Sequence, residues 1–315
     1  MRVLVGLVVA AALLYGGYWF VGQSQVENRT EAALENLAAA GWHVRYGTVN
    51  TTGFPSRFDT TITDLHLAPP DGRWAWAAPF VQALALSYRP NRIIAAFPPE
   101  QEIVVGQERM TLRTDRLRAS GGVGLTPDLP LDQVVIESGP WDVVGSSGWR
   151  VAAERLLAAL RPSAAGPRHY DLYLETGPLT LPAPAPPLSA VRLDGVVELD
   201  RPLDRRIGGA PDLVALAISE ARLQAGEGAL TLRGDLAPDE AGFLAGVLTV
   251  AAEDWRALLT AAEQAGLLGV AAREPFERGL EAAAQGSDTI EIPVTLANGV
   301  VSALGFPLAA APRLR

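Results

Sequence analysis

The stretch Thr51–Leu67, "TTGFPSRFDTTITDLHL", joins a segment with glycine and proline directly to a run of alternating apolar and polar residues. Gly53 and Pro55 are residue types that favour a turn, and the alternation from Phe58 onward is typical of a half-buried β-strand. The segment is therefore either a ligand-binding loop or the bend by which the chain enters a sheet. We favour the bend, and we place it between a strand that ends near Asn50 and one that starts at Phe58.

The residue types in this bend predict where its side chains lie. Phe54 and Phe58 are large and apolar, so we expect both in the core, where they would anchor the bend. Arg57 has acidic residues close by in the sequence, and we expect it to form an ion pair with one of them. In this interpretation the role of the stretch is architectural.

Strand-like alternation recurs along most of the chain, which predicts a β-dominated fold. In the first half the clearest predicted strands are Phe58–Leu67, Val81–Tyr88, Met110–Leu117 and Gln133–Val144. In the second half we interpret "LDGVVEL", "LRGDLAP" and "LANGVVS" as strand–turn–strand units. Helical patterns occupy Val26–Ala40, Trp149–Leu160, Glu253–Leu268 and a segment around Pro275–Ala284, where Pro275 suits a first helical turn. The predicted class is α+β and β-dominated, with an N-terminal transmembrane helix, long antiparallel sheets and a few packed helices.

Residues 166–190 are dense in proline and include "LPAPAPPLSA", a composition that does not suit the interior of a sheet. This segment is either a connection between two halves or an excursion within one continuous sheet. The first interpretation divides the chain into an anchor or uncleaved signal (1–25), a β-rich half with helices (26–165), the proline-rich connection (166–190), and a second β-rich half with a helical pair (191–315).

Composition excludes several classes of protein. Hydrophobic residues make up 49% of the 315 residues and charged residues 19%, so the chain can bury a sizeable core. A net charge of −9 has the wrong sign for nucleic-acid binding, and no basic stripe occurs. The 26 basic residues are all arginine, and cysteine is absent. A phosphate-loop lysine, a Schiff-base lysine, a disulfide and a zinc–thiolate site are therefore impossible.

The N-terminus contains a membrane-spanning signal. No charged residue occurs from Val3 to Gly22, a run of 20 residues, and a helix of about that length spans a hydrocarbon core of roughly 30 Å. Arg2 and the α-amino group precede the run, so the positive-inside rule keeps that end in the cytoplasm. Tyr15, Tyr18 and Trp19 gather toward the other end, where aromatic rings favour the membrane interface.

We assign the membrane anchor to Val3, Leu7, Leu14, Tyr18, Trp19 and Phe20. A signal peptide cleaved at Gly22-Gln23-Ser24 is the alternative. In both cases the remaining chain lies outside the cytoplasm.

Residues with catalytic chemistry are sparse. The histidines His43, His66 and His169 have no metal-ligand spacing among them, and no G-x-S-x-G motif is present. "GSSGW" at Gly145–Trp149 has the wrong spacing for that motif and suggests the start of a helix. Asp64 and His66 would share one face of a strand, either as the start of a carboxylate–histidine hydrolase site or as an exposed polar face. We predict no catalytic residue, no metal and no cofactor.

An aromatic cluster is the candidate binding feature. "GRWAWAAPF" brings Trp74, Trp76 and Phe80 close in sequence to Phe54 and Phe58. These five residues either line an apolar groove, approach the membrane surface or pack in the core. They are the candidate ligand-binding residues.

The chain resembles domain of unknown function 2125, a family of exported bacterial proteins. The similar parts are the Gly-x-Pro-x-Arg entry at Gly53–Arg57, the tryptophan-to-proline element Trp76–Pro79, "SYRPNRIIA" at Ser87–Ala95, and the closing "LANGVVSALGFPLAAAPRL". The resemblance implies an exported bacterial protein and transfers no activity. The chain is more distantly similar to AsmA-type envelope proteins, which implies elongated β-sheets with an apolar concave side that handles lipid.

Together these observations predict a protein held in the bacterial inner membrane by a single pass, with its C-terminal domain in the periplasm. We expect a non-enzymatic role in envelope maintenance, through binding of lipid or another apolar ligand. A protein–protein scaffold and a hydrolase with an Asp64/His66 site are the alternatives. The sequence does not indicate which protein partners it would have.

Overall fold

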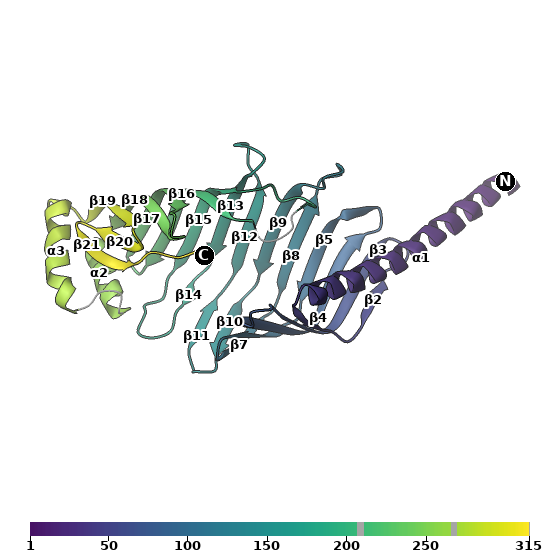
Figure 1. The fold of residues 1–315 in the computed structure, drawn as a ribbon, viewed down its shortest axis with the longest axis horizontal. Coiled ribbons are helices and arrows are strands. Elements are labelled where there is room, and N and C mark those ends of the chain that lie inside the picture. The colour runs from purple at the N-terminus through teal and green to yellow at the C-terminus, as the bar shows by residue number, and fades with distance from the viewer. Residues whose placement is uncertain (207–210, 266–269, 315) are drawn as a thin grey trace. The chain divides into compact units, whose positions relative to one another are not determined.

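The computed structural model describes residues 1–206, 211–265 and 270–314. It contains two compact units, Met1–Leu125 with Glu137–Trp149, and Thr126–Ile136 with Arg150–Arg315. Figure 1 shows that strands dominate both units and that all strand pairs run antiparallel where their register is defined. The predicted β-dominated α+β class is confirmed.

The first unit is a sheet with one long helix. Its strands are β1 (His43–Arg45), β2 (Val49–Thr52), β3 (Arg57–Ala68), β4 (Trp74–Leu86), β5 (Arg89–Phe97), β6 (Glu100–Val105), β7 (Glu108–Thr114), β8 (Leu117–Val123) and β10 (Trp141–Gly145). Strand β3 pairs with β1, β2 and β4. Strand β4 continues to β5 and β8 along one part of its length and to β6, β7 and β10 along the other.

The helix of this unit is α1 (Arg2–Ala39), which is continuous. The sequence predicted its apolar part and Val26–Ala40 as separate features, and the structure joins them because no residue between them breaks the helix. The chain leaves the helix at Gly41, whose φ of +92° suits glycine.

The bend at Gly53–Arg57 lies between β2 and β3, as predicted. Gly53 has a φ of +105°, and Arg57 forms an ion pair of 2.7 Å with Asp59. Phe58 is buried, which confirms its expected place. The expectation for Phe54 is wrong, because this ring is 56% exposed on the outside of the bend.

The second unit contains the longer sheet. Its strands are β9 (Leu131–Ser138, most of which belongs to this unit), β11 (Arg150–Ala153), β12 (Leu156–Pro162), β13 (His169–Thr176), β14 (Leu179–Thr180), β15 (Ala190–Leu199), β16 (Leu213–Ala225), β17 (Gly228–Pro238), β18 (Leu244–Glu253), β19 (Thr289–Ala297), β20 (Val300–Ala303) and β21 (Phe306–Ala310). The pairing runs from β9 through β12, β13 and β15 to β21 in sequence order, and β11 pairs with β14. Strands β13 and β15 are direct neighbours, so the proline-rich residues 181–187 form an excursion between adjacent strands.

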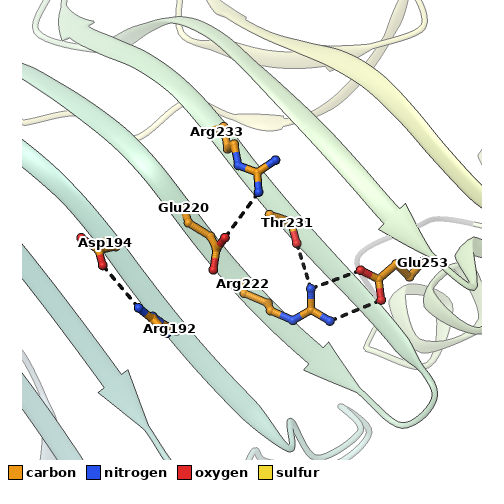
Figure 2. Close-up of polar contacts among 7 residues, drawn as sticks. All are labelled: Arg192, Asp194, Glu220, Arg222, Thr231, Arg233 and Glu253. Atoms are coloured by element: carbon orange, nitrogen blue, oxygen red, sulfur yellow. Dashed lines mark hydrogen bonds and ion pairs between the residues drawn. The ribbon is translucent and has the colours of Figure 1, made fainter.

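The two faces of this sheet differ in chemistry. Directly opposite residues share a face, and one face carries the apolar pairs Leu174↔Leu193, Val197↔Leu216 and Leu232↔Val250. The other face carries ion pairs across and along the strands (Figure 2). They include Arg233–Glu220 at 3.4 Å and Arg222–Glu253 at 3.2 Å. The sheet is therefore amphipathic.

Two predicted helical features are strands or turns. Trp149–Leu160 is wrong as a helix, because residues 156–162 pair with β13 along the whole length of β12. "GSSGW" is a turn and not a helix start. Its Ser147 amide and hydroxyl donate to Glu108 Oε1, at 3.0 and 2.9 Å, so this carboxylate binds the groups that would otherwise start a helix.

Several strand boundaries also differ from the prediction. "LDGVVEL" and "LRGDLAP" lie inside β15 and β17 without a turn, whereas "LANGVVS" is the β19–β20 turn, with positive φ at Asn298 and Gly299. The predicted strands 110–117 and 133–144 are each divided between two observed strands. Gly139 and Pro140 interrupt the second of them.

Helices α2 (Trp255–Gln264) and α3 (Val270–Ala284) confirm the predicted helical pair. Residues 266–268 of the predicted first helix lie outside the described residues. Helix α3 begins earlier than expected, so Pro275 lies inside the helix and not in its first turn. In Figure 1 these helices lie at the end of the sheet that contains β17 and β19, where α2 contacts β17 and α3 contacts β19.

Candidate functional site

Helix α2 presents one apolar face to the sheet of the second unit. Its Trp255, Leu258, Leu259 and Ala262 recur at the i, i+3, i+4, i+7 spacing of a single helix face. The helix starts at Asp254, whose Oδ1 accepts a hydrogen bond of 3.1 Å from the Ala257 amide. This cap satisfies one of the free amides at the helix start and fixes where the apolar face begins.

Helix α3 and the sheet complete an apolar pocket with a volume of about 370 Å³. Phe276 and Leu280 line it from α3, and β21 contributes Leu308 and Ala309. The strands contribute the floor, which consists of Leu230, Val250, Ala252, Ile290, Ile292, Val294 and Ala303. All the described residues of the lining are apolar, so the pocket offers dispersion contacts and no charged group.

Polar contacts outside the pocket hold α2 in place. The Trp255 indole N–H donates to the Ser287 carbonyl at 3.2 Å, while its ring is 1% exposed. Arg256 lies over that ring at 4.3 Å and forms an ion pair of 3.0 Å with Asp288. An ion pair between Glu263 and Arg273 joins α2 to α3. The walls of the pocket are therefore fixed from outside while its interior stays apolar.

The arrangement suits an apolar ligand. Small-molecule sites in proteins commonly enclose about 300–1,000 Å³ and are lined mainly by apolar side chains. The pocket also borders the apolar face of the sheet, where Leu216, Ile218 and Leu232 pack beside the buried Leu236 and Leu248. On strands farther along the sheet, Leu174 and Leu193 of the same face are only half-buried.

The five predicted ligand-binding aromatics all lie in the first unit, so none of them lines this pocket. Phe54 and Phe58 lie beside α1, and Phe80 is half-buried in β4. Trp74 contacts Trp42, and Trp76 contacts Phe97 while its N–H donates to Gln101 at 3.0 Å.

Sequence reasoning missed the pocket residues. The apolar spacing in "WRALLTAA" was a usable signal for a helix face. Nothing in the local sequence indicates that residues as distant as Leu230 and Ala303 would face it.

The predicted anchor residues have two different environments. Val3, Leu7, Leu14 and Phe20 are exposed by 78%, 64%, 77% and 61%. Tyr18 is half exposed, with its hydroxyl donating to the Ser87 carbonyl in the β4–β5 turn, and Trp19 is buried. Among the described residues, α1 is the one helix long and apolar enough to cross a membrane.

Asp64 and His66 line a second, polar cavity of about 310 Å³ on the sheet of the first unit, together with Glu100, Glu102 and Thr111. Both side chains are exposed. Within residues 1–206, 211–265 and 270–314, no hydrogen bond joins the two, and no cluster of acidic or histidine side chains fits a metal ion.

The fold and the pocket define a class: a β-sheet protein with an apolar N-terminal helix and an apolar pocket under two helices. The family model described as "Uncharacterized protein conserved in bacteria (DUF2125)" matches residues 19–312. The chain therefore belongs to the DUF2125 family, as its sequence motifs suggested. No curated protein and no solved structure matches the chain.

Proposed function

We propose that this protein is held in the bacterial inner membrane by α1 and binds the acyl chain of a lipid in the apolar pocket of its second unit. Its role is non-enzymatic and belongs to maintenance of the cell envelope. The observation that carries the proposal is the pocket of about 370 Å³ whose described lining is entirely apolar.

Membrane attachment is supported by the 20-residue uncharged run Val3–Gly22. The exposed Val3, Leu7 and Leu14 side chains form an apolar surface that water does not favour. Arg2 at the start of the run favours a cytoplasmic N-terminus, and this orientation places both sheets in the periplasm.

An acyl chain is the ligand because the described lining of the pocket offers apolar contact area and no charged side chain. A buried polar group on the ligand would find no partner among the described lining residues and would cost free energy. Each methylene that leaves water contributes about 0.8 kcal/mol, so a chain of modest length suffices for binding. A lipid headgroup would stay outside the apolar lining, in contact with water.

Photolabelling of the full chain in phospholipid vesicles that contain diazirine-labelled palmitic acid tests this proposal. We expect labelled peptides from Trp255–Gln264 and from the second half of α3, in addition to α1. The substitution Ala262→Phe fills the pocket and should reduce labelling of these peptides severalfold. Ala282→Phe adds the same volume on the exposed face of α3 and should leave labelling unchanged.

Labelling of α1 serves as an internal control for insertion into the vesicles. If α1 is labelled and the α2 peptide is not, the protein is a membrane protein without an acyl site. That result would favour a scaffold role. Labelling that is equal in the two variants would also contradict the proposal.

A further inference from the structure

Helix α1 is packed tightly against the sheet of the first unit at Trp19. This indole is 3% exposed, stacks on Phe58 with ring centroids 5.9 Å apart, and donates its N–H to the Arg57 carbonyl at 2.8 Å. One turn later Gly22 meets the same ring, where a Cβ atom would lie 2.6 Å from Phe58 Cζ. The helix and the bend at Gly53–Arg57 therefore form one packed element.

Polar contacts extend this packing in both directions along α1. Toward the N-terminus, Tyr18 donates to the Ser87 carbonyl at 2.7 Å, and the Tyr15 and Ser87 hydroxyls lie 3.0 Å apart. Toward the C-terminus, Gln23 donates to the Thr51 carbonyl at 2.8 Å. Residues 15–23 are thus fixed to the bend and to the β4–β5 hairpin.

The length of the free part of α1 decides where this packed element lies. From Val3 to Leu14, the residues before the first contact at Tyr15, the helix has only 12 residues, and they span about 18 Å at 1.5 Å per residue. A hydrocarbon core is about 30 Å thick. The rest of a transmembrane span must come from residues 15–22. Because these residues contact the bend and the hairpin, both lie at the membrane.

The surface of the packed element suits that position. Phe20, Phe54 and Tyr88 are exposed by 61%, 56% and 63%, and the first two rings stack with centroids 5.8 Å apart. Aromatic rings of this kind favour the interfacial zone of a bilayer. The exposed Arg89 follows Tyr88 in the chain, where its guanidinium group can reach a lipid phosphate, whereas Arg57 is paired with Asp59.

We infer that the bend Gly53–Arg57 and the hairpin tip Leu86–Arg89 form a membrane-contact rim, embedded in the interfacial zone of the bilayer that α1 spans. This inference rests on the proposed membrane attachment. The sheet of the first unit then touches the membrane directly and does not hang from a free helix. The occupant of the exposed aromatic surface is lipid and not a second protein.

The absence of cysteine makes the test direct. Single cysteines are introduced by Phe54→Cys and Tyr88→Cys, labelled with the environment-sensitive dye NBD, and the full chain is reconstituted in phosphatidylethanolamine–phosphatidylglycerol vesicles. Leu7→Cys reports on α1. Val105→Cys is the matched control, since Val105 is 50% exposed and pairs with Trp74, at the end of β4 opposite Leu86.

We expect dyes at positions 7, 54 and 88 to be quenched by doxyl-labelled lipids, with iodide quenching at least about fivefold lower than at position 105. If the dye at position 7 is protected from iodide but the dyes at 54 and 88 are not, the membrane-contact rim is refuted and the membrane anchor stands. If iodide quenches the dye at position 7 as well, both the membrane anchor and the membrane-contact rim are refuted. Protection at 54 and 88 that disappears when the protein is diluted into more lipid would identify a second copy, and it would overturn the inference.

Discussion

Trp255 lines the pocket and belongs to the buried cluster beneath α2 and α3. Its ring is 1% exposed within a cluster that includes Leu259, Leu280 and Ile290. Its N–H bonds to the Ser287 carbonyl, so the side chain joins the start of α2 to the turn before β19. It therefore contributes both to the stability of the second unit and to the shape of the site.

Replacing Trp255 should cost much of this stability. Trp255→Ala removes a buried aromatic side chain and leaves a cavity, so we expect the free energy of unfolding to fall by about 3–5 kcal/mol. Trp255→Phe retains most of the apolar contact and should cost clearly less. Urea unfolding followed by circular dichroism measures both changes, and a loss below about 1 kcal/mol for alanine would contradict the assigned packing.

Glycine is required at two positions of the apolar face. Gly234 and Gly246 have φ values of +144° and +149°, and a Cβ atom would lie 2.3 Å from the Val247 carbonyl oxygen and 2.1 Å from that of Asp235. Gly234→Ala and Gly246→Ala should each lower the unfolding free energy by about 1–3 kcal/mol. Gly139→Ala, where the added carbon meets no atom within 4 Å, should be nearly neutral. Equal urea-unfolding midpoints for all three variants would refute the claim that Gly234 and Gly246 are required at these positions.

Local chemistry explains which residues could be predicted from the sequence. The bend at Gly53–Arg57 and the Arg57–Asp59 ion pair depend on neighbours in the chain, and the structure confirms both. Phe54 was misplaced because hydrophobicity alone predicts burial. Its exposure follows from its position on the outside of the bend, beside Phe20 of α1, a helix that is distant in the sequence.

At the scale of single elements, β12 shows where sequence periodicity fails. "WRVAAERLLAAL" is rich in residues that favour helices, yet its second half alternates Leu156, Ala158 and Leu160 on one face of the sheet. Pairing with β13 along the whole of β12 outweighs that local preference. Helices α2 and α3 were predictable because both local propensity and apolar spacing favour them.

The turn from Gly145 to Trp149 provides a prediction on pH. Hydrogen bonds from the Ser147 amide and hydroxyl lower the pKa of the Glu108 carboxyl below its usual range. A lowered folded-state pKa contributes stability that is present above the unfolded pKa and is lost as the pH falls through the folded value. The wild-type protein should therefore lose more stability than Glu108→Gln between pH 6 and about 3.

Urea midpoints at the two pH values, for both proteins, measure this difference. Because Glu108→Gln leaves the other carboxylates unchanged, their common acid effect cancels in the comparison. Parallel losses in the two proteins would show that the carboxylate does not stabilise the turn.

At the scale of the whole molecule, the class of fold could be predicted and the site could not. Alternation of residue types is a local signal, so it revealed a β-dominated chain with an apolar N-terminal helix. The pocket needs Leu230, Ile292 and Ala303 to meet two helices, and this depends on strand pairing between distant parts of the second unit. The predicted aromatic site remains a prediction for the first unit.

The same distinction applies to the anchor. Hydropathy located its 20 apolar residues, whereas only the packing of Trp19 and Tyr18 shows that part of this run also carries the sheet of the first unit. We infer from this packing that the membrane contacts the bend at Gly53–Arg57. We assign lipid binding to the second unit.

Native mass spectrometry of the full chain, purified from its bacterial membrane, tests that assignment most directly. We expect one bound acyl-containing molecule on the wild-type protein and on Ala282→Phe, and loss of that molecule from Ala262→Phe. A wild-type protein without a bound lipid under conditions that keep the fold intact, or equal occupancy in Ala262→Phe, would contradict the claim that this pocket holds an acyl chain.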